Sequence, residues 1–403
     1  MLLSDEARAA GYTVTKCDKS PCLFYVKEIH AVLTLHVDDG HGAGPDVESR
    51  KFLEWLSSKI ELKYSTGLGI GAQYEFLRCT KSWTKEGLYT TPSAKYGDDC
   101  LEAYGMKDCK PSNSPKLEKE DMPGDEALLD DDAASRFKSC TCRLSYLASE
   151  RPDLQAVVGI MCKDLKGPMV KSERQMKKVL RYVQGTRECS NFCPFDAKLD
   201  GISVFTDGDW ATNKVDRKWR SGCVVRCAGT RMHTHSRSQP TVALSSCEAE
   251  IIAAVEGLKE GLMLQYLLEF VGFGRHRVSL HINSSAARAF AHREGVGRMK
   301  HLDARYLWLQ QLVPDNVVIV KKVPRTEQFA DCLTKVPVNG DLVKWAHDIG
   351  IVRLEQNKFH EVRMQKASAH GSSLEQLVRF CCVHCLAWQN HQQSLLSGMM
   401  RQI

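Results

Sequence analysis

The sequence lacks the features of membrane and secreted proteins. No apolar run among its 403 residues is long enough to span the hydrocarbon core of a bilayer, so we expect no membrane insertion. No secretory signal opens the chain, and its 17 cysteines are scattered along it, so a disulfide framework is not expected. We therefore interpret the cysteines as mostly reduced thiols and predict a cytoplasmic or nuclear protein.

A strong excess of charge of either sign is also missing. The formal net charge is +6, and the hydrophobic and charged fractions are 43% and 26%, which are ordinary for a folded protein and argue against extensive disorder. The slight basic excess is compatible with an anionic partner such as nucleic acid but does not by itself indicate one. The length allows two or three domains, each with its own core.

The tail beyond about Val336 lacks a clear pattern of helices or strands. It contains the cluster Cys381-Cys382-Val383-His384-Cys385, whose side chains are of the kinds that bind zinc. Four ligands within five residues cannot surround one tetrahedral ion, and no second ligand pair stands at zinc-finger spacing. We interpret this cluster as a helix rich in reduced cysteines.

The first hundred residues predict a short helix followed by strands and turns. Met1–Ala10 reads as helix, and Leu23–Val26 and Ala31–Val37 are short runs rich in β-branched and aromatic residues. Lys27–His30 between these runs predicts a hairpin turn, and Asp38-Asp39-Gly40 predicts a second turn after them.

A polar stretch from Lys110 to Asp132 predicts an exposed connection, and a helical pattern follows from Ala133 to Glu188. Leu144, Leu147 and Ala148 have the spacing of one helix face. A later helix carries a run of basic residues, which is either a solvated face or a nucleic-acid contact. These residues are Lys171, Arg174, Lys177, Lys178 and Arg181.

The segment from about residue 199 to 336 has the clearest pattern. It predicts three consecutive strands, a long helix, and then strands alternating with helices, which is typical of a mixed sheet with helices packed on it. The predicted strands are Ser203–Thr206, Gly222–Val225, Arg231–Thr234, Val278–Ile282 and Val317–Val323. The predicted helices are Glu248–Phe270, Ala286–His292, Ala304–Val313 and Glu327–Thr334.

Several motifs in this segment occur in the order found in one family. The motifs are Phe205-Thr206-Asp207-Gly208-Asp209-Trp210, Ser245-Ser246-Cys247-Glu248-Ala249-Glu250 and Gln328-Phe329-Ala330-Asp331-Cys332-Leu333-Thr334-Lys335. They resemble the RNase H motifs of copia-type retrotransposon Pol polyproteins, and Pro240–Ser246 and Lys300–Tyr306 resemble further blocks of that family. The resemblance covers most of residues 12–336.

The resemblance implies an α/β fold: an RNase H-like mixed sheet with flanking helices, preceded by a partial reverse-transcriptase palm and a helical thumb or connection. We expect the palm over residues 1–110, the helical segment over 111–198, the RNase H-like domain over 199–336 and an uncharacterised tail over 337–403. The sequence does not indicate an oligomeric state.

The family's activity implies a metal site and a nucleic-acid partner. RNase H enzymes cut the RNA strand of an RNA–DNA hybrid, and paired divalent ions stabilise the attacking and leaving oxygens. By resemblance, Asp207, Glu248 and Asp331 would bind Mg²⁺ or Mn²⁺. Each of these acids taken alone also fits a helix cap or a strand end, but the three in family order favour the metal site.

The fourth ligand of the family departs from the pattern. Its expected position falls on Asn283, or on Ile282 after a shift of one residue, and no Asp or Glu occurs between Glu269 and Glu294. Asparagine keeps a carbonyl oxygen but lacks the negative charge that offsets a divalent ion. We therefore expect weakened metal binding and a severe loss of cleavage.

A second departure concerns polymerase activity. His36-Val37-Asp38-Asp39 resembles the family's Tyr-Val-Asp-Asp hairpin, with Ser20–Phe24 before it and Gly105–Pro111 after it matching neighbouring segments. Asp38 and Asp39 would then bind a metal ion. A further palm aspartate should lie upstream of the 37 residues (38 minus 1) that precede Asp38. We therefore expect no polymerase activity from this chain alone.

Binding of nucleic acid can persist without cleavage. Basic side chains of this segment either contact phosphates or form a solvated surface, and the sequence does not decide between the two. They are Arg217, Lys218, Arg220, Lys300 and Arg305. The alternative function is therefore a non-catalytic nucleic-acid-binding protein that retains the RNase H fold.

Overall fold

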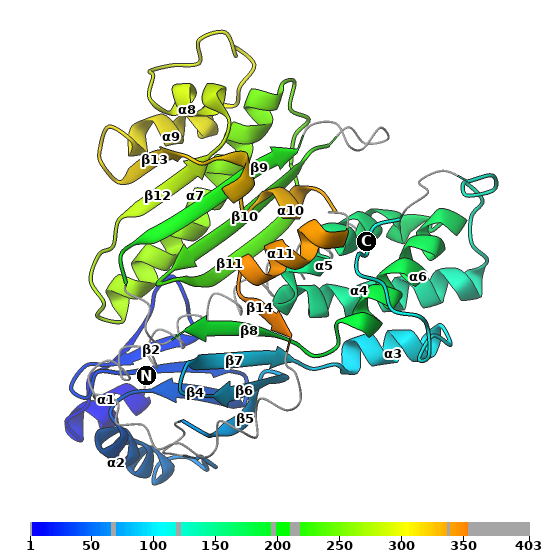
Figure 1. Cartoon of the computed structure of the whole chain (residues 1–403). Helices are drawn as coiled ribbons and strands as arrows, with labels where there is room; N and C mark the ends of the chain where they lie inside the picture. The colour runs from blue at the N-terminus through cyan, green and yellow to red at the C-terminus, as the bar shows by residue number, and fades with distance from the viewer. Residues whose placement is uncertain are drawn as a thin grey trace.

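The computed structural model describes residues 2–65, 70–117, 122–194, 199–209, 218–336 and 339–353. The cysteine cluster at 381–385 and Arg217 lie outside the described residues. The described chain forms three β-sheets and a group of helices (Figure 1). Among the described helices, none combines the length and the apolar character that crossing a membrane requires.

The first sheet has the strand order β1-β2-β3-β4 and is antiparallel. Its strands are β1 (Val14–Lys16), β2 (Leu23–Val26), β3 (Ala31–His36) and β4 (Asp39–Ala43). The predicted hairpin turn between β2 and β3 is confirmed, because Val26 pairs with Ala31. Helix α1 (Leu2–Ala9) precedes the sheet as predicted, and α2 (Asp46–Ser57) follows it in a segment predicted to hold strands and turns.

The second sheet joins segments that lie far apart in the sequence. Its order is β14-β8-β7-β6-β5, with β5 (Gln73–Phe76), β6 (Cys79–Trp83), β7 (Gly87–Pro92), β8 (Cys189–Pro194) and β14 (Ile351–Arg353). The prediction that the chain beyond about Val336 has no clear helices or strands is wrong, because α11 (Asn339–Asp348) and β14 lie there. A strand of three residues has too little alternation to be recognised, and pairing with β8 defines it.

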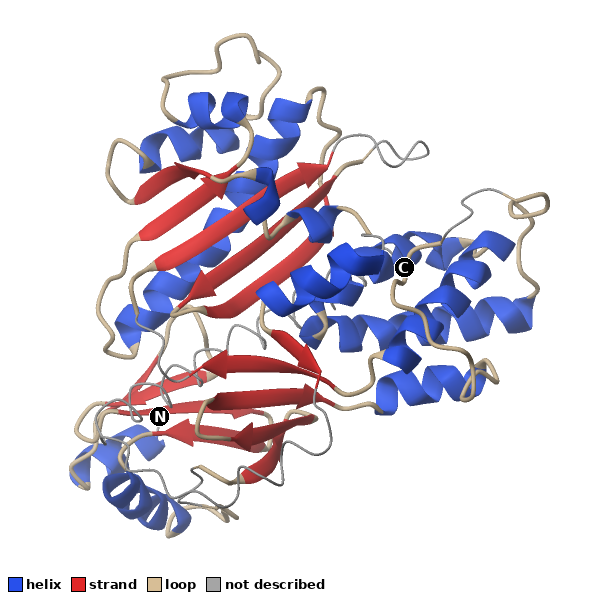
Figure 2. Cartoon of the chain, viewed as in Figure 1, coloured by secondary structure: helices blue, strands red, loops and turns tan. Residues whose placement is uncertain are grey.

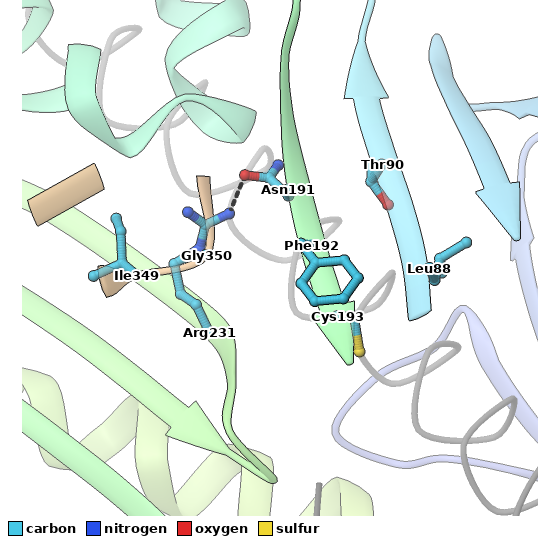
Figure 3. Close-up of a pocket in the computed structure, with 8 residues that line it drawn as sticks. All are labelled: Leu88, Thr90, Asn191, Phe192, Cys193, Arg231, Ile349 and Gly350. Atoms are coloured by element: carbon cyan, nitrogen blue, oxygen red, sulfur yellow. Dashed lines mark hydrogen bonds between the residues drawn. The ribbon is translucent and has the colours of Figure 1, made fainter. Parts of the chain in front are cut away.

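A pocket lies where this second sheet approaches β11 (Figure 3). Arg231 of β11 extends across this junction, and its guanidinium donates a hydrogen bond to Oδ1 of Asn191 at 2.7 Å. The residues that line the pocket are Leu88, Thr90, Asn191, Phe192, Cys193, Arg231, Ile349 and Gly350.

The helical part contains α3 (Lys95–Ala103), α4 (Asp131–Glu150), α5 (Pro152–Met161) and α6 (Val170–Gly185). Asp130 caps α4 by accepting a hydrogen bond from the amide of Ala133 at 2.8 Å. Part of the basic run on α6 takes part in intramolecular ion pairs: Arg174 pairs with Asp125, and Lys177 pairs with Glu173. These two side chains therefore contribute to the fold.

The third sheet has the order β11-β10-β9-β12-β13. Its strands are β9 (Ile202–Asp209), β10 (Arg220–Cys227), β11 (Thr230–Ser238), β12 (Val278–Ile282) and β13 (Val318–Lys322). The first three are antiparallel, and β12 runs parallel to β9 and β13. The predicted mixed sheet is confirmed, with strand ends that lie up to a few residues from the predicted ones.

Helices cover both faces of this mixed sheet (Figure 2). The long helix α7 (Ser246–Phe270) packs on one face, where Val204 and Leu258 belong to the same core. Phe205 points to the other face and shares a core with α5 and with α10 (Asp331–Thr334). The smaller helices α8 (Ser285–Ala291) and α9 (Trp308–Leu312) lie beside β12 and β13 (Figure 1).

Candidate carboxylate metal site

The site begins at the end of β9, where Asp207 is buried with an exposed fraction of 4%. The hydroxyl of Thr334 on α10 donates a hydrogen bond to Oδ2 of Asp207 at 2.6 Å. Burial raises the pKa of Asp207, and the nearby carboxylate of Asp331 raises it further. The sheet and α10 therefore bring acids from distant parts of the sequence together, as the motif order predicted for Asp207 and Asp331.

A lysine balances part of this negative charge. The ammonium of Lys335 lies 3.5 Å from Oδ1 of Asp209 and 3.6 Å from Oδ1 of Asp331. Burial alone would lower the pKa of Lys335, but the carboxylates of Asp331, Asp209 and Asp207 raise it. Lys335 therefore remains charged and holds Asp209 and Asp331 on either side of its ammonium group.

Glu250 on α7 supplies a further carboxyl group. Gly208 directly follows Asp207 in the chain, and its amide donates a hydrogen bond to Oε2 of Glu250 at 3.3 Å. Burial and the charge of Asp207 raise the pKa of Glu250 to about 8. Gly208 is needed here because a Cβ at this position would lie 2.5 Å from the carbonyl oxygen of Ala249. The start of α7 approaches β9 closely enough for Glu250 to face the site.

Glu248, the acid predicted to act from this helix, makes different contacts. Its Oε2 accepts a hydrogen bond from the amide of Leu244 at 2.7 Å and lies 3.0 Å from Nε2 of His301. The hydroxyl of Ser245 accepts a hydrogen bond from the amide of Glu248 at 3.2 Å. The structure thus gives Glu248 the contacts of a helix cap and brings Glu250 beside Asp207. The metal-binding role expected for Glu248 stays a prediction.

The sequence contained a signal for this difference. Ser245 and Glu248 stand three residues apart at the start of α7, which is the spacing of a capping box. Residues two apart on a helix point to different sides because each turn holds about 3.6 residues. If Glu248 caps the helix, Glu250 therefore points to a different side of α7. Asp209 was also not predicted as a site residue, although it lies within the first of the three motifs.

Asn283 directly follows β12, the parallel neighbour of β9. The register pairs His281 with Phe205, so continuing it by two residues places Asn283 level with Asp207. Oδ1 of Asn283 is buried and makes no hydrogen bond within the described residues, and the same holds for Oδ2 of Asp209. Buried oxygens without partners next to several carboxylates fit the coordination of a hard divalent ion such as Mg²⁺ or Mn²⁺.

Asp38 lies in the turn between β3 and β4, and Asp39 is the first residue of β4. Strand β4 belongs to the first sheet, which lies apart from β9 and α10 (Figure 1). The side chains of Asp38 and Asp39 are exposed, and Val37 before them has a positive φ of 54° and an exposed fraction of 88%. A turn is confirmed here, but it lies at Val37 and Asp38, one residue earlier than predicted, because Asp39 and Gly40 already pair with β3 as the first residues of β4. Within the described residues, neither carboxylate belongs to a group of three or more possible metal ligands.

The basic side chains expected near phosphates differ in their exposure. Lys218, Lys300 and Arg305 are exposed. Arg220 is buried instead, with an exposed fraction of 6%, and donates a hydrogen bond to Oγ of Ser236 at 3.0 Å. Neither alternative left open by the sequence, a phosphate contact or a solvated surface, fits Arg220, because its guanidinium is enclosed between β11 and α5.

Known proteins with similar sequences are retrotransposon polyproteins. The chain is 30% identical over 336 residues to the retrovirus-related Pol polyprotein from transposon TNT 1-94 of Nicotiana tabacum. It is 26% identical over 330 residues to the Pol polyprotein from transposon RE2 of Arabidopsis thaliana, and each match covers 80% of the chain. The chain belongs to the copia-type retrotransposon Pol family. It spans 25% of the tobacco polyprotein and 22% of the Arabidopsis one.

Solved structures similar to the chain include RNase H domains. One is the N-terminal RNase H domain of a Mycobacterium tuberculosis protein, solved as a fusion with maltose-binding protein. It is 20% identical, covers 36% of the chain and 96% of the solved chain, and has a TM-score of 0.24. No model of a protein family matches the chain.

Proposed function

We propose that this Pol fragment keeps a divalent-metal site of the RNase H type, binds an RNA–DNA hybrid and cuts its RNA strand poorly. The observation that carries the proposal is the convergence of Asp207, Glu250 and Asp331 at the end of β9, with a neutral Asn283 level with Asp207. The family of the chain supports the same reading.

The carboxylates of Asp207, Glu250 and Asp331 are the residues that would hold the metal, with the carbonyl oxygen of Asn283 beside them. A bound pair of Mg²⁺ or Mn²⁺ ions supplies activation of the attacking water and stabilisation of the leaving oxygen. Thr334 orients Asp207 through its hydrogen bond, and Gly208 orients Glu250. Lys335 reduces the repulsion among the acids while the metal is absent.

Poor cleavage follows from the charge of this site. Several converging carboxylates are needed to offset paired divalent ions, and Asn283 contributes none. Glu250, whose pKa is about 8, must also lose a proton before it binds metal at neutral pH. Both features weaken metal binding, and neither disturbs the packing of the sheet.

The proposal is tested by cleavage of an RNA–DNA hybrid labelled on its RNA strand, with Mg²⁺ or Mn²⁺. We expect weak cutting by the unmodified chain and a gain of about tenfold or more in Asn283→Asp, since even the loss of a group that only supports the metal ligands costs about 10–100-fold in metal affinity or activity. Asp207→Asn should abolish cutting. Glu250→Gln and Glu248→Gln form a matched pair, and only the first should lower metal affinity.

Each outcome of this assay has a defined meaning. Strong cutting by the unmodified chain that Asp207→Asn abolishes would contradict the proposed impairment. Binding of the hybrid without cutting, even in Asn283→Asp, would favour the alternative of a non-catalytic nucleic-acid-binding protein. Equal loss of metal affinity in Glu248→Gln and Glu250→Gln would contradict the assignment of Glu250.

The preceding part of the chain is proposed to be a remnant of the polymerase, with a palm over residues 1–110 and a thumb or connection over 111–198. The exposed turn at Asp38 and Asp39 supports this, because its hairpin has the form that the resemblance implies. Metal-dependent nucleotidyl transfer needs additional carboxylates. We therefore expect no primer extension by this chain on a primed RNA template.

A further inference from the structure

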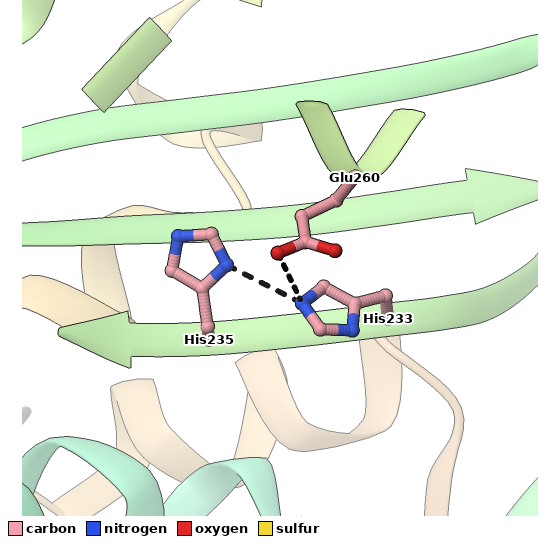
Figure 4. Close-up of side chains that lie close together, drawn as sticks. All are labelled: His233, His235 and Glu260. Carbon is pink, nitrogen blue, oxygen red and sulfur yellow. Dashed lines mark hydrogen bonds and ion pairs between the residues drawn. The ribbon is translucent and has the colours of Figure 1, made fainter. Parts of the chain in front are cut away.

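A second group of potential metal ligands lies between β11 and α7. It consists of His233 and His235 on β11 and Glu260 on α7 (Figure 4). One ligand atom from each residue lies within 4.8 Å of the others. Nε2 of His233 is 3.3 Å from Nδ1 of His235 and 3.8 Å from Oε1 of Glu260.

The fold explains why these side chains meet. Residues two apart on a strand point to the same face, so His233 and His235 both face α7. Their neighbour Cys223 on β10 pairs with His235 and lies next to Gly257, one helical turn before Glu260. Because Gly257 has no side chain, α7 approaches the sheet closely, and Glu260 reaches β11.

This group is distinct from the carboxylate site. In the register of the sheet, His235 pairs with Cys223, and Cys223 pairs with Thr206. Asp207 is the next residue on β9, so its side chain points to the opposite face, where Thr334 binds it. Asp207 and the two histidines therefore lie on opposite faces of one sheet, and the two sites use different side chains.

The distance between the two imidazole nitrogens matches tetrahedral coordination. Zinc–nitrogen bonds of about 2.0–2.1 Å at a tetrahedral angle place two ligand nitrogens about 3.3–3.4 Å apart, and the imidazole nitrogens are 3.3 Å apart. The carboxylate of Glu260 lies 3.8 Å from Nε2 of His233, about 0.4–0.5 Å beyond this spacing, and within 4.8 Å of the His235 ligand atom; its side chain is 27% exposed. A small rotation of this side chain completes three ligand positions.

We propose that His233, His235 and Glu260 form a binding site for Zn²⁺ or a similar transition-metal ion, with water in the fourth position. Two imidazoles and one carboxylate are a donor set that zinc accepts and that hard Mg²⁺ does not prefer. The ion links β11 to α7 across the face of the sheet opposite Asp207.

The electrostatics of the site favour neutral imidazoles. Burial, followed by the charges of Arg237 and Arg231, lowers the pKa of His233 to about 3. A neutral imidazole keeps the lone pair that a metal needs. Arg237 also opposes metal binding, because its Nη1 lies 3.4 Å from Oε1 of Glu260 and competes for this carboxylate. The side chain of Arg237 is 35% exposed, so it has room to move toward solvent.

The test is titration of the full chain, freed of metal by a chelator, with Co²⁺ followed by Zn²⁺. We expect the visible absorption of tetrahedral cobalt, displaced by Zn²⁺ and unaffected by excess Mg²⁺. His235→Asn and Glu260→Gln should each weaken binding about tenfold or more, as loss of a ligand does. Arg237→Gln should tighten it, because the competitor of the metal is removed.

Controls separate this site from others in the chain. His347→Asn changes an exposed histidine whose side-chain exposure is 79%, and Asp207→Asn changes the carboxylate site; neither should alter the tetrahedral cobalt absorption. Cobalt bound by cysteines would instead show intense near-ultraviolet absorption from thiolate ligands. Circular dichroism of each variant checks that it folds.

Two results would overturn the proposal. One is the absence of tetrahedral cobalt absorption in the unmodified chain. The other is cobalt affinity that stays unchanged in folded His235→Asn and Glu260→Gln. Because the readout is a spectrum and not cleavage, its failure leaves the proposed RNase H-type function untouched, and the reverse also holds.

Discussion

At the scale of single residues, the choice between Glu248 and Glu250 shows how neighbouring acids acquire different roles. Both lie in the first turns of α7 and both are buried, with exposed fractions of 6% and 9%. Glu248 accepts a hydrogen bond from the amide of Leu244, which stabilises the helix start. Glu250 is buried beside Asp207 with a raised pKa, which is costly unless a cation arrives. A raised pKa beside other acids is typical of functional sites.

Glu250 should therefore make the stability of the metal-free protein depend on pH. Its pKa in the folded chain is about 8 against a reference value of 4.5, so its stabilising contribution is complete below pH 4.5 and is lost as pH rises through 8. We expect Glu250→Gln to raise the free energy of unfolding at pH 8.5 by about 1–2 kcal/mol and to change it little at pH 4.5. Urea denaturation with a chelator present measures this.

Glu248→Gln is the matched control for this experiment. It weakens a helix cap, so it should lower the free energy of unfolding by about 0.5–2 kcal/mol without the gain at high pH. A stabilising effect of Glu248→Gln at pH 8.5 equal to that of Glu250→Gln would contradict the assigned roles.

At the scale of elements, the contact between α7 and β9 positions both candidate sites. Gly257 and Gly261 of α7 lie against Thr206 and Val204 of β9. Glycine costs helix stability in general, and here it is required because any Cβ would clash with the sheet. This close contact places Glu250 near Asp207 and Glu260 near β11.

Gly257→Ala should consequently lower the free energy of unfolding by about 1–3 kcal/mol, although alanine is the better helix former. The new Cβ would overlap the methyl group of Thr206. In a double-mutant cycle, Thr206→Ser removes this methyl group, so the double variant should lose less stability than the sum of the single variants. If the two changes in the free energy of unfolding simply add, the contact with Thr206 is not what restricts residue 257 to glycine.

Elements also show the limit of periodicity. The strands of the mixed sheet and the long helix α7 were recognised because their apolar patterns are strong. Strand β8, the three-residue strand β14 and the helix α11 were not recognised. The two strands are defined by tertiary contacts, because β8 pairs with β7 and β14 pairs with β8. Helix α11 contributes Leu342 and Trp345 to the second core.

At the scale of the whole molecule, the hydrophobic cores do not respect the boundaries suggested by the sequence. One core joins Leu23 and Val32 of the first sheet to Val204 and Leu258 of the mixed sheet and α7. Tyr25 of the first sheet also contacts Phe270 of α7, with ring centroids 6.3 Å apart. A second core joins the helical segment to α10 and α11. We therefore expect the regions to unfold together.

Trp345 of α11 tests this coupling. Its side chain is buried in the second core, and its indole donates a hydrogen bond to the carbonyl of Phe329 at 2.7 Å. Trp345→Ala should lower the free energy of unfolding by about 3–5 kcal/mol, seen as one shifted thermal transition for the whole chain. Val343→Ala, at an exposed position of the same helix, should have little effect. Two separate transitions in calorimetry would contradict the single cooperative unit.

The sequence by itself determined the family, the order of strands and helices in the mixed sheet, and Asp207 and Asp331 as members of one carboxylate cluster. These follow from local patterns and motif order, which a chain carries along its length. Only the tertiary structure decided that Glu250 rather than Glu248 faces Asp207, that Lys335 lies between Asp209 and Asp331, and that His233 and His235 meet Glu260. The phase of a helix against a sheet depends on how their side chains pack, and no local pattern contains that information.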